Sequence, residues 1–203
     1  MLADMTSTSS ITEFHDDALA LIAGRLAELN RRSLAQAHPR ACVLLSLCTK
    51  HGEPAFLFTK RSDLVGTHKG QVSFPGGHMD PTDADEVACA LRELEEETHI
   101  APASVRVLGH FHDVHSIHQV RVTPVVGFVG EMGDASSLDV SAEEVDIAFA
   151  LSLQEVLAPD KREWQDLGPY RIPIFQAGPA PVWGLTAYLV MEFVQEVLQL
   201  KIE

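Results

Sequence analysis

The sequence has few cysteines, few basic residues and no long apolar run. Its three cysteines show no metal-ligand spacing, and an odd count argues against a disulfide framework. No apolar stretch approaches the roughly 20 residues that cross a bilayer, so we expect no membrane span. Lysine and arginine total 15 against 29 acidic residues, a net charge of −14. This charge argues against binding to nucleic acid or to an anionic membrane.

Size and composition favour one globular domain. The chain has 203 residues, of which 46% are hydrophobic, enough to bury one substantial core. We find no internal repeat and no convincing linker, and therefore expect residues 1–203 to form a single domain. The first ten residues contain no lysine or arginine, unlike a secretory signal or an arginine-rich transit peptide. We expect a cytoplasmic location, with the mitochondrion left open as the alternative.

Strand-like and helix-like patterns alternate irregularly along the chain. Ser10 and Glu13 form a capping-box pattern before a helix predicted at about 10–30, and Asp83 and Glu86 form another before a helix predicted at 83–98. The remaining predicted helices are 153–157 and 184–200, and the predicted strands are 41–48, 55–59, 71–74, 105–111 and 120–129. Strands broken by isolated helices, without a regular βαβ order, predict a mixed sheet flanked by helices.

The last predicted helix carries an apolar row that fits either a core or a subunit interface. The row consists of Leu189, Phe193, Val197 and Leu200. We expect it to pack in the core, and a homodimer stays open as the alternative.

An acidic run at 92–97 is the strongest functional signal. On a helix, Glu93 shares a face with Glu96 and Glu97. Clustered carboxylates repel one another unless a cation neutralises them, and their oxygens are the ligands that Mg²⁺ and Mn²⁺ prefer. Leu91 and Leu94 can pack inward, so we expect the carboxylates at the surface of the fold. The alternative is an ordinary solvated acidic face.

A glycine corner just before this helix favours the metal hypothesis. The corner reads Phe-Pro-Gly-Gly at 74–77, and glycines let the backbone approach a ligand closely. A carbonyl oxygen, here that of Gly77, can join a metal shell. Gly77 followed by the run at 92–97 resembles the Nudix box, a Gly, a spacer, and Arg-Glu-apolar-x-Glu-Glu-x-Gly-apolar. Two departures occur: the spacer is one residue longer, with Ala84 at the usual glutamate, and His99 replaces the second glycine.

The resemblance implies a fold and a chemistry. It implies a Nudix-type α/β/α sandwich with a central mixed sheet, in which the box at 76–100 is a loop–helix–loop that binds a metal and a diphosphate. Segments 57–62 and 68–77 are similar to the extra signature of the coenzyme A pyrophosphatase branch, although Gly66 replaces one of its basic residues. That branch cleaves coenzyme A or its acyl or oxidised forms to 3′,5′-ADP and 4′-phosphopantetheine or the acyl form. The alternatives are a Nudix enzyme for ADP-ribose or a dinucleotide, and a binding module without turnover.

Site roles follow from the same resemblance. We expect Mg²⁺ or Mn²⁺ to be held by Glu93, Glu97 and Glu96 with Gly77. Glu96 and Glu144 are both candidates for the general base, Glu144 lying in an expected loop. Arg92 is expected to orient the carboxylates.

The substrate is expected to be a small anionic molecule, bound by local cations and by the backbone of the glycine corner. The nearest cations suit phosphate groups, although each is as easily a solvated surface charge. The expected substrate-binding residues are Lys60, Arg61, His68, Lys69 and Gly76.

Overall fold

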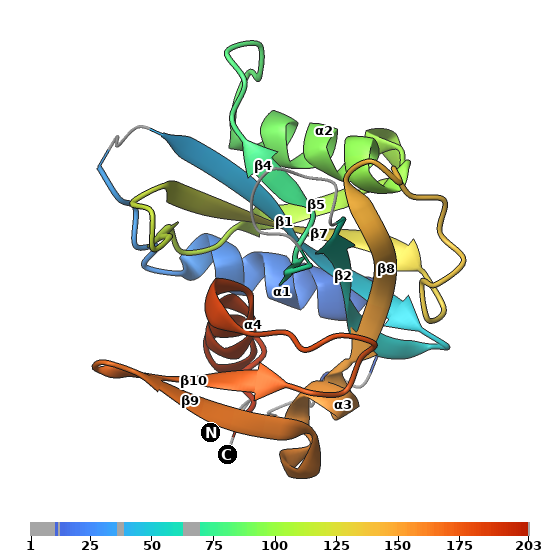
Figure 1. Cartoon of the computed structure of the whole chain (residues 1–203), viewed down its shortest axis with the longest axis vertical. Helices are drawn as coiled ribbons and strands as arrows, with labels where there is room; N and C mark the ends of the chain where they lie inside the picture. The colour runs from blue at the N-terminus through green and yellow to red at the C-terminus, as the bar shows by residue number, and fades with distance from the viewer. Residues whose placement is uncertain (1–10, 12, 36–38, 63–69, 203) are drawn as a thin grey trace, which may run out of the picture.

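A computed structural model describes residues 11, 13–35, 39–62 and 70–202 of the protein. Figure 1 shows the arrangement of its elements. The helices are α1 (Asp16–Glu28), α2 (Glu86–Thr98), α3 (Leu153–Leu157) and α4 (Gly184–Glu196), with short 3₁₀ turns at Pro102–Ser104 and Pro159–Lys161. The strands are β1 (Arg40–Lys50), β2 (Glu53–Arg61), β3 (Val72–Ser73), β4 (Gly76–His78), β5 (Arg106–His110), β6 (Val114–His115), β7 (Arg121–Glu131), β8 (Val145–Ser152), β9 (Arg162–Leu167) and β10 (Tyr170–Phe175).

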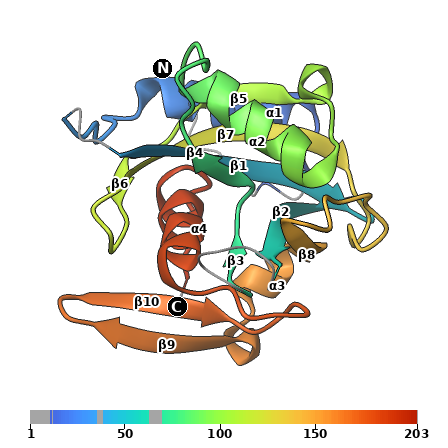
Figure 2. The same ribbon diagram turned by 45° about the horizontal axis from the view of Figure 1, so that its top comes forward.

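The central sheet is mixed, as the sequence predicted. Its strands run in the order β3-β2-β1-β7-β5, with β4 paired to β1, β6 to β7 and β8 to β2. The β1–β7 pair is parallel, whereas β1 pairs antiparallel with both β2 and β4. β9 and β10 form a separate two-stranded sheet that packs beside α4 (Figure 2).

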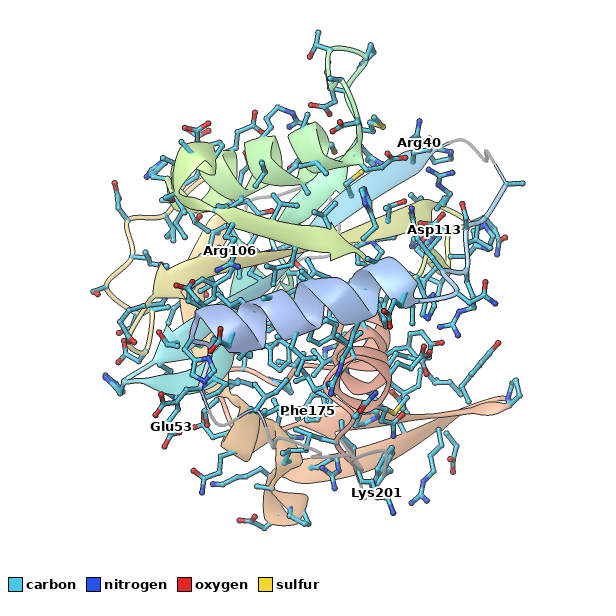
Figure 3. The ribbon with its side chains drawn as sticks, turned by 180° about the vertical axis from the view of Figure 1, so that it is seen from behind. Arg40, Glu53, Arg106, Asp113, Phe175 and Lys201 are labelled. Carbon is cyan, nitrogen blue, oxygen red and sulfur yellow. The ribbon has the colours of Figure 1, made fainter. Side chains whose placement is uncertain are left out.

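Helices cover both faces of the sheet. Alternate residues of a strand point to opposite faces, so β1 and β2 each feed two cores. Leu45 and Phe56 belong to the core that includes α1 and α4, whereas Leu44 and Leu57 belong to the core that includes α2. Figure 3 shows α1 lying across its face of the sheet when the molecule is seen from behind. The α/β/α layering predicted from the sequence is therefore confirmed.

The start of α2 differs from the prediction. Asp85, not Asp83, is the N-cap, and its side chain accepts a hydrogen bond of 2.8 Å from the Ala88 amide. Asp83 instead accepts hydrogen bonds from Arg92 and from the Asp80 amide. Its carboxylate oxygens are therefore occupied by these donors and do not cap the helix. The predicted capping box at 83–86 is therefore wrong.

The end of α2 shows how His99 replaces a glycine. His99 takes the left-handed conformation, with φ 53°, and its amide donates to the Glu95 carbonyl at 2.9 Å. Nδ1 of its ring lies 3.0 Å from Asp139 Oδ2. The helix therefore ends as it would with glycine, at the conformational cost of a non-glycine residue.

The two terminal helices are shorter than predicted. α1 begins at Asp16, capped by the His15 ring, which accepts from the Ala18 amide at 3.1 Å. Ser10 of the predicted capping box lies outside the described residues. α4 ends at Glu196 instead of 200, and its apolar row lies in the core, with Phe193 fully buried. No helix in the described residues is long and apolar enough to cross a membrane.

Candidate metal and diphosphate site

Glu97 is the buried centre of the acidic cluster. Its side chain is 1% exposed, and Thr59 Oγ1 donates a hydrogen bond of 2.8 Å to Oε2. The Gly76 amide donates to Oε1 at 3.3 Å, and Arg61 Nη1 lies 3.9 Å from the same oxygen. Burial raises the pKa of Glu97 to about 7, although these donors oppose the shift. The expectation that all the carboxylates lie at the surface is therefore wrong for Glu97.

The sheet provides this environment because β1 changes partner along its length. Its residues 47–50 pair with β2, whereas 41–43 pair with β4, the glycine corner. Thr59 continues the row of β2 side chains that faces α2, two positions after Leu57. Glu97, in the last turn of α2, thus contacts β2 and β4 together.

Glu93 lies against the glycine corner one helical turn earlier. A Cβ placed on Gly77 would stand 2.5 Å from Glu93 Oε2, closer than real Cβ atoms come. The absent side chain of Gly77 therefore makes room for this carboxylate. Burial raises the pKa of Glu93, and the charges of Glu96 and Glu144 raise it further while Arg92 lowers it.

Arg92 connects the acidic residues to one another. Its Nη1 donates to Glu93 Oε1 at 2.9 Å and to Glu96 Oε2 at 2.8 Å. Its Nε and Nη2 donate to the two oxygens of Asp83, both at 3.0 Å. This paired hydrogen bond holds the pKa of Asp83 at about 2, and a bidentate contact fixes the guanidinium plane. Asp83 therefore fixes Arg92, and Arg92 holds Glu93 and Glu96.

The two candidate bases come from different parts of the chain. Glu96 is half exposed, and Glu144 is partly exposed in a turn before β8, in agreement with the expected loop. The backbone of this turn is tied to the site because the Ser62 amide donates to the Glu144 carbonyl at 2.8 Å and the Ser141 amide donates to the Glu97 carbonyl at 3.0 Å. The negative charges of Glu96 and Glu144 both raise the pKa of Glu93.

The expected phosphate-binding residues are placed differently from one another. Arg61 lies beside Glu97, and Gly76 contributes its amide to the same carboxylate. Lys60 lies two residues after Phe58, so strand alternation places both side chains on the face of β2 opposite to Thr59 and Arg61. Its ammonium group pairs with Asp146. The structure does not bring Lys60 to Glu97. His68 and Lys69 lie outside the described residues.

The donor set fits a hard divalent cation by its chemistry. Glu93, Glu96 and Glu97 supply only oxygen atoms, and burial has raised the pKa of two of them, so that a cation would stabilise their charged forms. Across the described residues, no three His, Cys, Asp or Glu side chains stand close enough to hold a metal as they are. Instead, Arg92 contacts one carboxylate oxygen each of Glu93 and Glu96.

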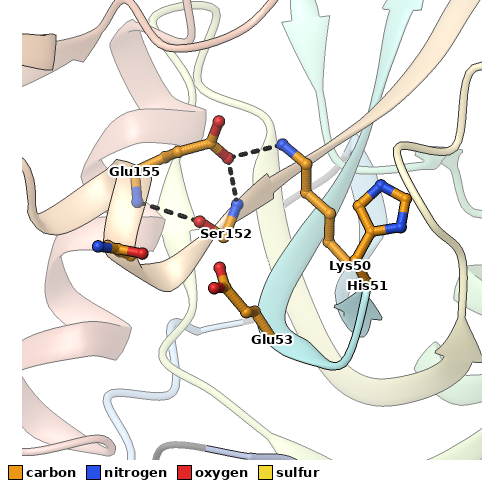
Figure 4. A pocket seen from close by; sticks show the side chains of 6 residues that line it. Lys50, His51, Glu53, Ser152 and Glu155 are labelled. Atoms are coloured by element: carbon orange, nitrogen blue, oxygen red, sulfur yellow. Dashed lines mark hydrogen bonds and ion pairs between the residues drawn. The ribbon is translucent and has the colours of Figure 1, made fainter.

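One of the surface hollows in the described part of the chain borders this site, and another lies away from it. A hollow of about 700 Å³ lies between Arg40 and the loop from His78 to Asp83, next to the residue that fixes Arg92. The other, of about 320 Å³, lies at the far end of β1 (Figure 4). There Lys50 Nζ pairs with Glu155 at 2.8 Å, and Glu155 also completes the capping box of Ser152. The Lys50 and Glu155 charges in this second hollow therefore neutralise one another.

The family follows from a comparison with known proteins. The family model of the NUDIX domain matches residues 37–170, about two thirds of the chain and the whole of the acidic cluster. The chain belongs to the Nudix family. This Nudix chain is 41% identical over 184 residues to the human "Mitochondrial coenzyme A diphosphatase NUDT8", covering 88% of the chain and 75% of the relative. It is 35% identical over 167 residues to the "Uncharacterized Nudix hydrolase NudL" of Yersinia enterocolitica, covering 80% and 83%.

A solved structure supports the fold alone. The chain superposes on a MutT/nudix family protein from Enterococcus faecalis with a TM-score of 0.54 and 13% sequence identity. The match covers 98% of this Nudix chain and 76% of the other.

Sequence reasoning missed two residues of the site. Thr59 entered only as part of a signature, and Asp83 was interpreted as a helix cap. The signal for Thr59 was its position in the strand, since it precedes Arg61 by two and so shares a face with it. The signal for Asp83 was weaker, because nine residues separate it from Arg92.

Proposed function

We propose that this Nudix chain hydrolyses the diphosphate linkage of coenzyme A or of its acyl or oxidised derivatives. The products are 3′,5′-ADP and 4′-phosphopantetheine or its acyl form. The observation that carries the proposal is the 41% identity with the human coenzyme A diphosphatase across 88% of the chain. It is supported by the Glu93, Glu96 and Glu97 cluster, because a module that only bound its ligand would not need three adjacent carboxylates.

Mg²⁺ or Mn²⁺ is the proposed cofactor, with Glu93, Glu96, Glu97 and the Gly77 carbonyl as its ligands. When bound, such an ion neutralises phosphoryl oxygens and lowers the pKa of bound water. The chain's own contribution is to hold the carboxylates on one helix against a glycine corner that leaves room for Glu93. The high pKa of Glu97 means that cation binding also releases a proton below about pH 7.

The proton of the attacking water is assigned to Glu96 or Glu144. Glu96 belongs to the same helix face as Glu93 and is held by Arg92 at 2.8 Å. Glu144 lies in the turn before β8, and its negative charge raises the pKa of Glu93. Glu96→Gln and Glu144→Gln distinguish the two, because loss of the base lowers kcat and removes the acidic limb of the pH–rate profile.

Arg61 is the proposed contact for a substrate phosphate. Its Nε is buried and has no hydrogen-bond partner among the described residues, and its Nη1 lies 3.9 Å from Glu97 Oε1. A guanidinium held at the edge of the carboxylate cluster can donate two hydrogen bonds to a phosphate. Gly76, Lys60, His68 and Lys69 remain proposed as substrate-binding residues.

A substrate panel tests the proposal against its alternatives. Coenzyme A, acetyl-coenzyme A, ADP-ribose and a diadenosine polyphosphate are each incubated with the protein and Mg²⁺ or Mn²⁺. Turnover of coenzyme A above the others supports the proposal. Turnover of ADP-ribose or the dinucleotide alone would retain diphosphate hydrolysis as the reaction but reject coenzyme A as the substrate. Binding without turnover would identify a binding module.

Cellular location and assembly are separate proposals. We propose the cytoplasm, and the mitochondrion is the alternative because the human relative is a mitochondrial coenzyme A diphosphatase. Fractionation of the source cells tests this. A homodimer is tested by light scattering of the purified protein.

A further inference from the structure

We propose that Thr59 is a positioning residue that holds the Glu97 carboxylate in the orientation needed to bind the cation. This inference rests on the proposed metal-dependent function. Thr59 is fully buried on β2, and its Oγ1 donates a hydrogen bond of 2.8 Å to Glu97 Oε2 across the boundary between sheet and helix.

Thr59 makes the tightest of the three contacts that orient this carboxylate. The Gly76 amide reaches Oε1 at 3.3 Å, and Arg61 Nη1 stands at 3.9 Å, beyond hydrogen-bond distance. A threonine side chain has a single stiff χ1 torsion, so its hydroxyl is fixed by the strand. Oε2 is therefore anchored, while Oε1, which points towards Gly76 and Arg61, is held more weakly.

Fixing a metal-binding carboxylate through a neighbouring donor affects cation affinity directly. Outer-shell partners of this kind typically change metal affinity by about 10- to 100-fold when they are removed. Replacing Thr59 by valine keeps the shape and burial of the side chain and removes only the donor. Thr59→Ser does the reverse, because it keeps the hydroxyl and removes a buried methyl group.

The chain contains a matched control for this pair. Thr123 is a buried threonine on β7, and its Oγ1 donates to the buried Asp113 Oδ1 at 2.9 Å. Asp113 is also bound by Arg31, at 2.6 Å, and lies outside the acidic cluster. Thr123→Val therefore removes an equivalent buried hydrogen bond from a carboxylate that has no proposed role in binding the cation.

The experiment measures Mn²⁺ affinity at one fixed pH, from the electron paramagnetic resonance signal of the free ion. The protein without substrate is used as wild type, Thr59→Val, Thr59→Ser and Thr123→Val, with melting temperatures recorded in EDTA. We expect Thr59→Val to bind Mn²⁺ about 10- to 100-fold more weakly. Thr59→Ser is expected to stay within about threefold of wild type while melting at a lower temperature, because it retains the donor and loses packing. Thr123→Val is expected to keep the wild-type affinity.

The outcomes separate this inference from the function on which it rests. Wild-type affinity in folded Thr59→Val, or equal weakening by Thr59→Val and Thr123→Val, overturns the positioning role alone. Absence of Mn²⁺ binding by the wild type overturns the proposed metal dependence as well. If Thr59→Val does not fold, Thr59→Ala replaces it and is compared with Thr59→Ser.

Discussion

Replacing Gly77 by alanine tests whether the position of the Glu93 carboxylate limits turnover. The added Cβ would stand 2.5 Å from Oε2 and 2.6 Å from the other carboxylate atoms of Glu93. Cβ atoms essentially never come closer than 3.0 Å to such neighbours. The carboxylate must therefore move by at least about 0.5 Å, a displacement of the size that degrades a preorganised site.

Activity is expected to fall while stability is retained. The atoms displaced by Gly77→Ala are the end of a flexible side chain, so we expect the free energy of unfolding to change by less than about 1 kcal/mol. We expect kcat/KM for coenzyme A to fall by about 10- to 100-fold, equivalent to about 1.4 to 2.7 kcal/mol of transition-state stabilisation.

Gly76→Ala is the matched comparison, because its Cβ would meet backbone instead. The nearest atoms are the Cys42 carbonyl oxygen and Val43 Cα, the latter at 2.7 Å. Strand β4 must separate from β1 to admit it, so we expect a loss of about 1–3 kcal/mol or more in unfolding free energy. Steady-state kinetics and urea unfolding of both variants provide the test. Wild-type kcat/KM in a folded Gly77→Ala variant would refute the reasoning.

Three further predictions concern substrate, pH and the helix end. Arg61→Ala should raise KM for coenzyme A more than KM for dephospho-coenzyme A, and equal losses in a steady-state comparison would remove its proposed role with the 3′-phosphate. The pKa of Glu97 is raised from 4.5 to about 7 in the folded protein, so the folded state holds the extra proton and stability is lost as the pH rises through this interval. In EDTA, urea unfolding of the wild type should therefore show up to about 3 kcal/mol less stability at pH 8 than at pH 4.5 from this group, and Glu97→Gln should remove that difference. A Glu97→Gln variant with the wild-type pH slope would contradict the assignment. His99→Gly should raise the unfolding free energy by about 1 kcal/mol, because it removes the strain of a non-glycine residue in the left-handed conformation. The loss of the exposed contact with Asp139 reduces this gain. Urea unfolding measures the net change, and a decrease would show that the Asp139 contact outweighs the backbone strain.

The acidic helix could be predicted from the sequence because the spacing of its glutamates alone places them on one face of a helix. Glu93 and Glu97 are one helical turn apart, and the Gly-Gly corner preceded them in a recognisable pattern. The long strands could be predicted equally well, since β1 and β7 are rich in apolar residues. These features depend on residues close together in the chain.

Features that depend on residues far apart in the sequence could not be predicted from it. The burial of Glu97 arises because Thr59 and Gly76, 38 and 21 residues away, approach it from two strands. The cap of α2 was misplaced because Asp83 has Glu86 three residues later, as a capping box requires, whereas in the structure its carboxylate is bound by Arg92 and Asp85 is the cap. Strands β4, β6, β8, β9 and β10 were missed, and β8, for example, is defined by its pairing with β2.

The central claim is tested most directly by incubating the purified protein with coenzyme A and Mg²⁺ or Mn²⁺ and identifying the products by mass spectrometry. Glu97→Gln is the control, because it removes the buried carboxylate with little change in side-chain volume. The account predicts 3′,5′-ADP and 4′-phosphopantetheine from the wild type and their loss in the variant. Coenzyme A left intact by the folded wild type with either metal, or cleaved equally by Glu97→Gln, would contradict it.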